Sequence, residues 1–536
     1  MFCEGKYIKV SKNCKDALQK LRYRDRERFL WVDAIAINQQ DNEEKSHQVA
    51  FMGKIYKSAD RALIWLGEAS SLRDPYFNLP LSDLFFDYVQ HMAAEIRDCK
   101  DTKKDPKTSP LYTNLLAQGA ALVSRQESSP LIQGFLEVVR RPWWERVWVV
   151  QEAALVKTAT IFCGGRQIEH SDISDFWSVI RNDMSHNSGL TYSLLDGFKH
   201  HMDAVTLVRE RIDTIGHAKA LAKVLDKCRR LQSTDRRDRV YAMLGMFGDF
   251  QKDLPQPNYQ SRSQGLFAEM TVKFLTLLDG LQILGNATNV NTTDDLPSWA
   301  VDFARRPKFH CAVIDHVYQT SPRDSLPCFK VCKDFKELKI AGRHIDRIKT
   351  LPKAPLEGYH NPYIPLKALL GYQQSCKVGQ MLESYHTGED PVDVLWRTMC
   401  WDVDGEYSCP ASSSLRRPFE NFRNSLLSGK SAEEIEPELL SDEAHDFNDI
   451  CVHSMPLCIT EKGFLGSVPW SAEEGDDIVV FSGGELPFVI RRREGEGEGE
   501  DGEGYRFIGS CYVHGIMHGE AVPQSFGEDM EWFCLR

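Results

Sequence analysis

The sequence of 536 residues lacks both a long apolar run and a leader-like N-terminus. No uninterrupted apolar stretch approaches the ~18 residues that suggest a membrane span. Charged residues recur every few positions in the first thirty residues, so the apolar core of a secretory signal peptide is missing there. We therefore predict a cytoplasmic protein without a membrane-spanning segment.

An excess of positive charge is also lacking. Asp and Glu number 77 against 65 Lys and Arg, which gives a formal net charge of -12. Proteins that bind nucleic acids neutralise phosphates with Lys and Arg, so DNA or RNA is disfavoured as the main partner. Hydrophobic residues make up 42% and charged residues 26%, as in globular proteins, so a large core can form.

The cysteines lack the spacing of a disulfide framework or a zinc ribbon. There are 15, an odd number, and none forms a Cys-x-x-Cys pair. The closest pair, Cys328 and Cys332, has no second ligand pair at zinc-finger spacing. His514 and His518 lie near Glu520, but in a predicted strand and turn. We expect reduced, mostly buried thiols and no metal site.

A glycine-rich stretch near residues 493–504 lacks the Gly-x-Gly-x-x-Gly spacing of a dinucleotide-binding loop. It alternates Gly with Glu, and segments 486–490 and 505–513 on either side have the composition of strands. This pattern predicts a solvated acidic loop that joins the two strands of a hairpin.

Short apolar runs alternate with helical periodicity in the N-terminal third. The runs lie at residues 29–32, 61–66 and 158–162, and the first two flank an amphipathic helical pattern that follows a cap at Asp41 or Asn42. Wholly apolar runs are typical of strands buried on both faces. We therefore predict that the three runs share one parallel sheet of an α/β domain.

Polar residues follow the first of these runs at the edge where parallel sheets bind ligands. Asp33 ends the run, and Asn38 and Gln39 come soon after it. Two interpretations stay open for each: Asp33 either binds a ligand or caps the loop, and the two amides either bind a ligand or form a turn.

The segments of the chain differ in composition and periodicity, which suggests three domains. We predict an α/β domain over residues 1–170, a helical region over 171–305 and a mixed, β-rich module over 306–536. Within the helical region, Asp235, Arg237, Asp238 and Arg239 indicate a salt-bridged helix start, with an interface role as the alternative.

Glu152 is the most informative single residue. After Pro142, adjacent pairs recur every four positions and predict one helix face, made of residues 143, 144, 147, 148, 151, 152, 155 and 156. Six of these are Trp, Val or Leu, and a carboxylate among them is costly to bury unless it is paired or used. Either Glu152 pairs with Arg146, Arg141 or a backbone N–H, or it is a catalytic or ligand-binding carboxylate.

Four ordered blocks resemble the fungal heterokaryon incompatibility (HET) domain, namely residues 30–39, 47–56, 62–67 and 141–152. Segments 235–245, 296–299 and 512–520 are similar to sequences that accompany this domain. The resemblance implies a cytosolic protein of self/non-self recognition, akin to innate immunity, whose activation leads to programmed cell death. It also implies protein partners and self-assembly on activation.

HET domains are in turn distantly similar to TIR domains, whose NAD-cleaving members carry Trp-x-x-x-Glu on a helix. Trp148-Val-Val-Gln-Glu152 has this spacing. The resemblance implies a TIR/flavodoxin-like parallel sheet, Glu152 as the catalytic residue of an NAD glycohydrolase, and Trp148, Asp33 and Asn38 as residues that bind NAD. NAD would be the substrate, and no resident cofactor is implied.

One departure from the family leaves the activity open. Family members usually begin with a strand and loop of the form Tyr-x-x-Leu-Ser-Tyr-x-Trp-Gly, and this sequence starts after it. In TIR-like sites the loop after that strand helps to bind the nucleotide, so the departure favours a non-catalytic adaptor or a degenerate relative. The enzyme and the adaptor are therefore both carried forward.

Overall fold

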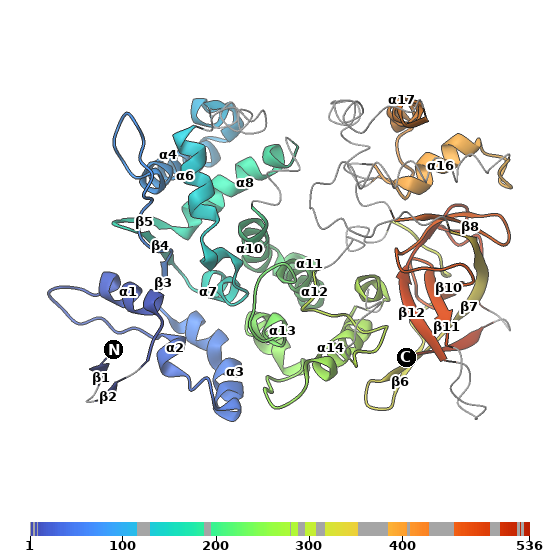
Figure 1. The fold of residues 1–536 in the computed structure, drawn as a ribbon, viewed down its shortest axis with the longest axis horizontal. Helices are drawn as coiled ribbons and strands as arrows, with labels where there is room; N and C mark the ends of the chain where they lie inside the picture. The colour runs from blue at the N-terminus through green and yellow to red at the C-terminus, as the bar shows by residue number, and fades with distance from the viewer. Residues whose placement is uncertain are drawn as a thin grey trace. The chain divides into compact units, whose positions relative to one another are not determined.

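The chain folds into two compact units (Figure 1). The structure is a computed structural model that describes residues 2–3, 6–7, 9–114, 129–186, 195–278, 280–287, 295–306, 317–351, 384–404, 408–427, 455–493, 504–522, 526 and 530–536. Unit 1 comprises residues 1–262 and 303–306, and unit 2 comprises residues 263–302 and 307–536. The predicted division into three domains stays a prediction.

Unit 1 contains a small mixed sheet. Strands β3 (Ala62–Trp65) and β4 (Ala159–Cys163) pair in parallel, and β5 (Arg166–Glu169) returns antiparallel to β4. The turn between β4 and β5 uses Gly164 at φ +56°, a conformation that glycine adopts without strain. The predicted strands at 61–66 and 158–162 and their parallel pairing are therefore confirmed.

The predicted strand at residues 29–32 is wrong. Phe29 is 94% exposed, and the run leads into the short helix α2 (Asp33–Ala36) instead of a sheet. A strand buried on both faces needs hydrogen-bonded neighbours and covering helices, and among the described strands β3 pairs only with β4. The expected TIR/flavodoxin-like parallel sheet is accordingly not confirmed, because this sheet has three strands and only two of them are parallel.

Side-chain caps begin two of the helices before β3, and the cap of α3 is one that the sequence predicts. Ser11 accepts a hydrogen bond from the Cys14 N–H and caps α1 (Lys12–Leu21). Asp41 accepts hydrogen bonds from two backbone N–H groups and caps α3 (Asn42–Ser58). Side-chain caps satisfy N–H groups that have no partner inside a helix, which fixes where each helix starts.

The rest of unit 1 is helical around an aromatic core. Phe85, Phe135, Phe176 and Phe198 meet at ring distances of 5.4–6.2 Å. The remaining elements are β1 (Phe2–Cys3), β2 (Lys6–Tyr7), α4 (Leu81–Thr102), η1 (Pro106–Thr108), α6 (Pro130–Val139), η2 (Pro142–Glu145), α7 (Val149–Leu155), α8 (His170–His186), α10 (Asp196–Thr206), η3 (Leu207–Arg211), α11 (Ile212–Ile215), α12 (His217–Cys228), α13 (Asp238–Leu244) and η4 (Gly248–Asp253).

The continuous helix predicted after Pro142 is also wrong. The chain forms the 3-10 turn η2, then an extended backbone at Arg146, and only then α7. The cause lies far away in the sequence, because the Val147 N–H donates to the Gln232 carbonyl at 2.9 Å and the Gln232 N–H donates to the Glu145 carbonyl. These tertiary hydrogen bonds replace the helical ones.

Unit 2 contains the predicted β-rich C-terminal sheet, and five of its strands close into a barrel. β7 pairs antiparallel with both β10 and β14, and β11 and β12 complete the ring, with β12 and β14 parallel. β7 also continues into a second sheet with β8, β9 and β13. A closed sheet leaves no unpaired edge. The strands are β6 (Phe329–Cys332), β7 (Glu337–Thr350), β8 (Leu457–Thr460), β9 (Leu465–Ser467), β10 (Asp477–Phe481), β11 (Phe488–Arg492), β12 (Gly504–Ser510), β13 (Tyr512–Val513) and β14 (Glu531–Leu535).

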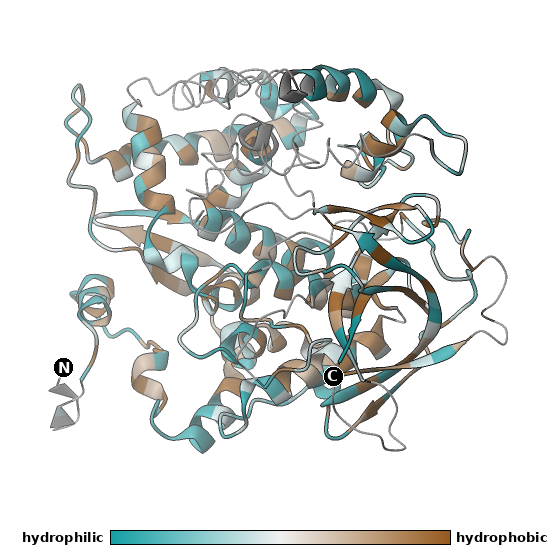
Figure 2. Ribbon diagram, turned by 45° about the vertical axis from the view of Figure 1, so that its right-hand side comes forward, coloured by the Kyte–Doolittle hydropathy of each residue, from teal (hydrophilic) through white to brown (hydrophobic). Residues whose placement is uncertain are grey.

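The barrel strands carry both hydrophobic and hydrophilic residues, as Figure 2 shows. Every residue of β10 is buried. The core of the sheet packs Ile348, Ile478, Val480, Val489 and Ile508 together. The helical elements of unit 2 are α14 (Ser263–Leu277), η5 (Gln282–Asn286), α16 (Pro391–Met399), η7 (Ser413–Leu415) and α17 (Arg416–Leu427).

The two strands of the predicted hairpin around the acidic tract are present. β11 and β12 pair antiparallel, with Arg491 opposite Arg506. The tract itself lies outside the described residues. Within the part of the chain that the structure describes, no helix has the length and apolar character needed to cross a membrane.

Candidate functional site

Glu152 lies in the first turn of α7 and is partly buried. The indole Nε1 of Trp143, a buried residue of η2, donates a hydrogen bond to its Oε2 at 3.4 Å. The break between η2 and α7 makes this contact feasible, because it turns the Trp143 side chain back toward the helix that follows. The aromatic partner of Glu152 is therefore Trp143.

The surroundings of Glu152 disfavour its charged form. Burial raises the pKa of the Glu152 carboxyl, the charge of Arg146 lowers it, and the charge of Asp33 raises it again, so the net pKa shift is upward. No charged group of Arg146 comes within ion-pair distance of Glu152, and Arg141 donates instead to the Glu68 carbonyl at 3.0 Å. Glu152 is thus not a member of a structural ion pair with either arginine.

Asp33 acts electrostatically on Glu152 although 119 positions separate them. It is the first residue of α2, and its Oδ1 accepts a hydrogen bond from the Ala34 N–H at 2.7 Å. Its charge also raises the pKa of both Glu152 and Tyr56. The structure therefore brings two of the sequence-predicted site residues together and gives one of them a local role as well.

Tyr56 of α3 completes the group, although the sequence did not single it out as a site residue. Burial, Glu152 and Asp33 all raise the pKa of its hydroxyl, so Tyr56 stays protonated. Its ring meets the ring of Trp31 edge-on at 5.8 Å. A hydroxyl on an otherwise apolar helix face was the available signal. We refer to Asp33, Tyr56, Trp143, Arg146 and Glu152 as the Glu152 cluster.

Trp148 and Asn38 point to other partners. Burial raises the pKa of the Asp238 carboxyl, and a hydrogen bond from the Trp148 side chain opposes this rise without cancelling it. Asn38 is exposed, its Oδ1 accepts from the Gln40 N–H at 3.2 Å, and its own N–H donates to Glu44. Asn38 therefore forms a turn, and neither residue lies in the Glu152 cluster.

Two glycines hold α3 and α7 in place. A Cβ on Gly53 of α3 would lie 2.4 Å from the Gly245 carbonyl oxygen, and a Cβ on Gly245 would lie 2.2 Å from Nε2 of Gln151. Only glycine permits so close a backbone approach. Gln151 is 1% exposed and neighbours Glu152, so this contact fixes the position of Glu152 relative to Tyr56.

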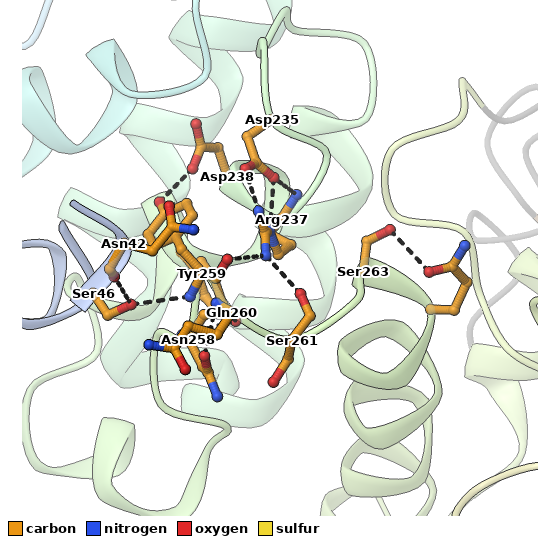
Figure 3. Close-up of polar contacts among 12 residues, drawn as sticks. Asn42, Ser46, Asp235, Arg237, Asp238, Asn258, Tyr259, Gln260, Ser261 and Ser263 are labelled. Carbon is orange, nitrogen blue, oxygen red and sulfur yellow. Dashed lines mark hydrogen bonds and ion pairs between the residues drawn. The ribbon is translucent and has the colours of Figure 1, made fainter. Parts of the chain in front are cut away.

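The predicted salt-bridged start of α13 supports the same region (Figure 3). Arg237 makes two hydrogen bonds to the Asp235 carboxylate, at 2.9 and 2.7 Å, and also donates to the Tyr259 carbonyl at 2.8 Å. The Tyr259 hydroxyl donates to Asp238 at 2.5 Å, and the Tyr259 N–H donates to Ser46 of α3 at 2.9 Å. This network ties α13 to the beginning of α3.

The described residues contain no group of three His, Cys, Asp or Glu side chains arranged to hold a metal ion. His514 bonds to Glu389 at 3.1 Å and to the Tyr512 hydroxyl at 3.0 Å, while His518 lies 4.0 Å from the sulfur of Cys409. The two histidines thus have separate partners. The cysteines of the described segments are free thiols.

Comparison with known proteins gives two family matches and one relative. Residues 1–152 match the heterokaryon incompatibility protein (HET) family, and residues 438–533 match the Het-6 beta-barrel domain. Strand β7 precedes the second match, although it closes the barrel. Heterokaryon incompatibility protein 6, OR allele, of Neurospora crassa is 26% identical over an alignment 605 positions long. The alignment covers 96% of this chain and 85% of that protein. No solved structure matches the chain.

The two matches coincide with structural features of separate units. The HET match ends at Glu152 and includes Asp33 and Tyr56, and the barrel match includes β8 to β13 of unit 2. The relative aligns with nearly the whole chain and so includes both segments. The chain therefore contains one segment similar to the HET family and one similar to the Het-6 beta-barrel domain, and it resembles a heterokaryon incompatibility protein along most of its length.

Proposed function

We propose that this protein acts in the cytoplasm of a fungus as a heterokaryon incompatibility factor, in a role akin to innate immunity, and triggers programmed cell death through its HET domain. The support is the HET match over residues 1–152 together with a relative of that name that aligns with 96% of the chain. Incompatibility requires recognition of another protein, so we also propose protein partners and self-assembly on activation.

We further propose that the Glu152 cluster cleaves NAD⁺. The observation that carries this proposal is a partly buried carboxylate with a raised pKa, which has no ion pair among the described residues and is under the electrostatic influence of a second carboxylate. Structural carboxylates are normally paired, whereas raised pKa values are concentrated at functional sites. Cleavage of the nicotinamide–ribose bond would consume water and release nicotinamide, ADP-ribose and a proton.

The residues of the cluster have distinct parts in this proposal. Glu152 would hold the ribose hydroxyls and stabilise the positive charge that develops on the sugar in the oxocarbenium-like transition state. Asp33 would add to the negative potential that favours this charge. Trp143 would hold the Glu152 carboxylate in position through its indole N–H and exclude water with its ring.

Trp148 and Asn38 retain weaker proposed roles in binding NAD. Trp148 begins α7 and is held by Asp238, so its contribution would be to position the helix that carries Glu152. Asn38 would bind from the exposed turn after α2, with its side-chain N–H₂ group as the available donor.

An NAD-depletion assay tests the chemistry. Wild-type protein, Glu152→Gln and the control Glu68→Gln are compared, since Glu68 is an exposed glutamate of the same unit. Loss of a transition-state carboxylate is expected to slow cleavage by about 10²-fold or more, while the control keeps the wild-type rate. Undiminished cleavage by a folded Glu152→Gln protein would falsify the assignment of Glu152.

A non-catalytic adaptor is the second candidate, and one observation favours it. The run at residues 29–32 is exposed, so the sheet next to the cluster is small and open. Expression in fungal cells separates the two candidates, because an adaptor with Glu152→Gln would still cause cell death while the enzyme would not. Retained cell death together with no NAD cleavage by the wild-type protein supports the adaptor.

A further inference from the structure

Helix α7, which carries Glu152, is short and depends on other segments for its position. It has seven residues, whereas isolated helices shorter than ~12 residues are marginal in water. The last four carbonyl groups of a helix also have no partner inside that helix. The contacts at the two ends of α7 therefore decide where Glu152 lies.

Arg209 supplies a contact at the C-terminal end of α7. Its Nη2 group donates hydrogen bonds to the carbonyl oxygen of Ala153 at 2.6 Å and to that of Val156 at 3.1 Å. Ala153 directly follows Glu152, and Val156 is the first residue after the helix. A cation at this end of a helix also interacts favourably with the helix dipole. Arg209 thus caps α7 through two carbonyl groups.

The helical segment that carries Arg209 also contacts the hydrogen-bond partner of Glu152. Arg209 lies in the π-helical turn η3, which joins α10 to α11, and such turns occur frequently at functional sites. Earlier in this segment, the ring of His201 meets the ring of Trp143 edge-on at 5.0 Å, and Trp143 donates to Glu152. One helical segment therefore contacts both the end of α7 and the residue that bonds to its carboxylate.

We propose that Arg209 is a positioning residue for Glu152. By capping α7, Arg209 fixes the distance between the Glu152 carboxylate and the Trp143 indole N–H. It acts through the backbone, because among the described residues Arg209 makes no ion pair with Glu152 or with any other carboxylate. Arg209 follows the HET match over residues 1–152, so the site depends on residues beyond that match. The inference rests on the proposed function, since the position of Glu152 affects a rate only if Glu152 takes part in the reaction.

The surface location of Arg209 separates positioning from folding. The residue is exposed, so its removal opens no cavity in the core, and water can solvate the two released carbonyl groups. We therefore expect Arg209→Leu to fold, with the last turn of α7 loosened. Arg211→Leu is the matched control, because Arg211 lies in the same turn, is exposed and makes no side-chain hydrogen bond or ion pair with the described residues.

Nitrogen-15 NMR of the tryptophan indole groups in the full chain measures the positioning without NAD. The Trp143 resonance is the one that Glu152→Gln shifts most, since that variant changes its acceptor. Arg209→Leu should shift the same resonance. Arg209→Lys, which keeps a cationic donor, should return it toward the wild-type position, and Arg211→Leu should leave it unchanged.

NAD cleavage by the same variants measures the consequence for the reaction. Arg209→Leu should lower kcat about tenfold and leave KM within about twofold of the wild-type value, because Arg209 acts on the helix and not on the substrate. Arg209→Lys should recover most of this loss, and Arg211→Leu should keep the wild-type rate.

The outcomes separate the positioning role from the proposed chemistry. An unchanged Trp143 resonance in Arg209→Leu, an equal shift in Arg211→Leu, or an Arg209→Lys variant that behaves like Arg209→Leu each overturns the proposal. An unchanged kcat in Arg209→Leu, with a wild-type protein that cleaves NAD, overturns it as well. Absent NAD cleavage by the wild-type protein, together with the expected shifts of the Trp143 resonance, counts against the chemistry alone.

Discussion

Asp477 in unit 2 and Glu152 in unit 1 are both withdrawn from water, and their surroundings shift their pKa values in opposite directions. Burial disfavours the charge of Asp477, but hydrogen bonds from His344 at 3.2 Å and Arg347 at 2.9 Å outweigh it and lower its pKa. Glu152 receives one hydrogen bond from a neutral indole, and its pKa is raised.

The contrast follows from the two sheets. The strands of unit 2 close into a ring whose carboxylates are matched by arginines on neighbouring strands, so charge there stabilises the fold. The sheet of unit 1 is short and open, and the same unit contains an exposed apolar run and a carboxylate that has no ion pair among the described residues. Groups that do not stabilise a fold are those available for function.

The largest expected loss of stability comes from removing a barrel arginine. Asp476 is 2% exposed and accepts two hydrogen bonds from Arg491, at 2.7 and 3.0 Å. Arg491→Leu would leave that carboxylate buried without its cation, which costs about 3 kcal/mol. This is the low end of the usual range, because the Arg491 side chain is 26% exposed. Urea unfolding, with hydrogen exchange of β10 and β11, measures the loss.

Arg492→Leu is the matched control for this change. Arg492 is the next residue on β11, its side chain is 54% exposed, and it lies 3.3 Å from Asp477, which has other partners. We expect it to cost less than about 1 kcal/mol. Equal losses for the two variants would contradict the view that burial of the carboxylate decides the cost.

Next in size is overpacking at the glycine contact of unit 1. Gly53→Ala would push a methyl group to 2.4 Å from the Gly245 carbonyl oxygen, and separating α3 from α13 should cost about 1–3 kcal/mol. Gly265→Ala in α14 of unit 2 is the control, since a Cβ there meets nothing within 4 Å. The control should gain about 0.5–1 kcal/mol in free energy of unfolding, because alanine has a higher helix propensity than glycine. Thermal unfolding measures both the loss in Gly53→Ala and the gain in Gly265→Ala.

A pH-dependent loss of stability is expected from the histidine pair of unit 1. His170 and His201 are buried with their Nε2 atoms 3.1 Å apart, and burial lowers the pKa of His170 to about 3. The unfolded chain therefore binds more protons between about pH 6.5 and pH 3, and stability falls with pH through this window. From pH 7 to pH 5 we expect His170 alone to cost about 2 kcal/mol in urea unfolding, and His201, whose pKa burial also lowers, to add to this loss.

Replacing both histidines by Phe tests the origin of that loss. The rings pack against Trp143 and Trp144, so Phe keeps the aromatic contacts and removes the titrating groups. The double variant should lose much less stability between pH 7 and pH 5 than wild type does. An unchanged slope would assign the acid sensitivity to other groups.

The smallest predicted effect has the opposite sign. Because the pKa of Glu152 is raised in the folded state, the folded chain binds its proton more tightly than the unfolded chain does. Stability therefore decreases as pH rises above the unfolded pKa of about 4.3, and Glu152→Gln should stabilise unit 1 at pH 7 but not at pH 4. Thermal unfolding at both pH values measures this difference.

Asp477→Asn in unit 2 should respond in the reverse direction. Its lowered pKa means that the charged form stabilises the fold at pH 7, and that this contribution is lost as pH falls through the folded pKa. Asp477→Asn should therefore destabilise at pH 7. If Glu152→Gln also destabilised at pH 7, the contrast between the two carboxylates would be disproved.

Local sequence by itself determined several elements. The apolar runs at β3 and β4, the Asp41 cap of α3, the strands of the β11–β12 hairpin and the Arg237–Asp235 pair all depend on residues close in sequence. Periodicity, capping and turn composition encode such features directly. Glu152 also stood out from sequence alone, because a carboxylate among apolar helix positions is unusual wherever it folds.

Tertiary structure alone decided the remaining features. The run at residues 29–32 has the composition of a buried strand, yet no described strand pairs with it. Apolar composition favours burial, but it does not specify which strand will be the partner. Hydrogen bonds with Gln232 interrupt the helix before α7 and so bring Trp143 to Glu152. Asp33 and Tyr56 reach Glu152, and β7 closes the barrel, only through contacts between segments that are distant in sequence and that no local pattern records.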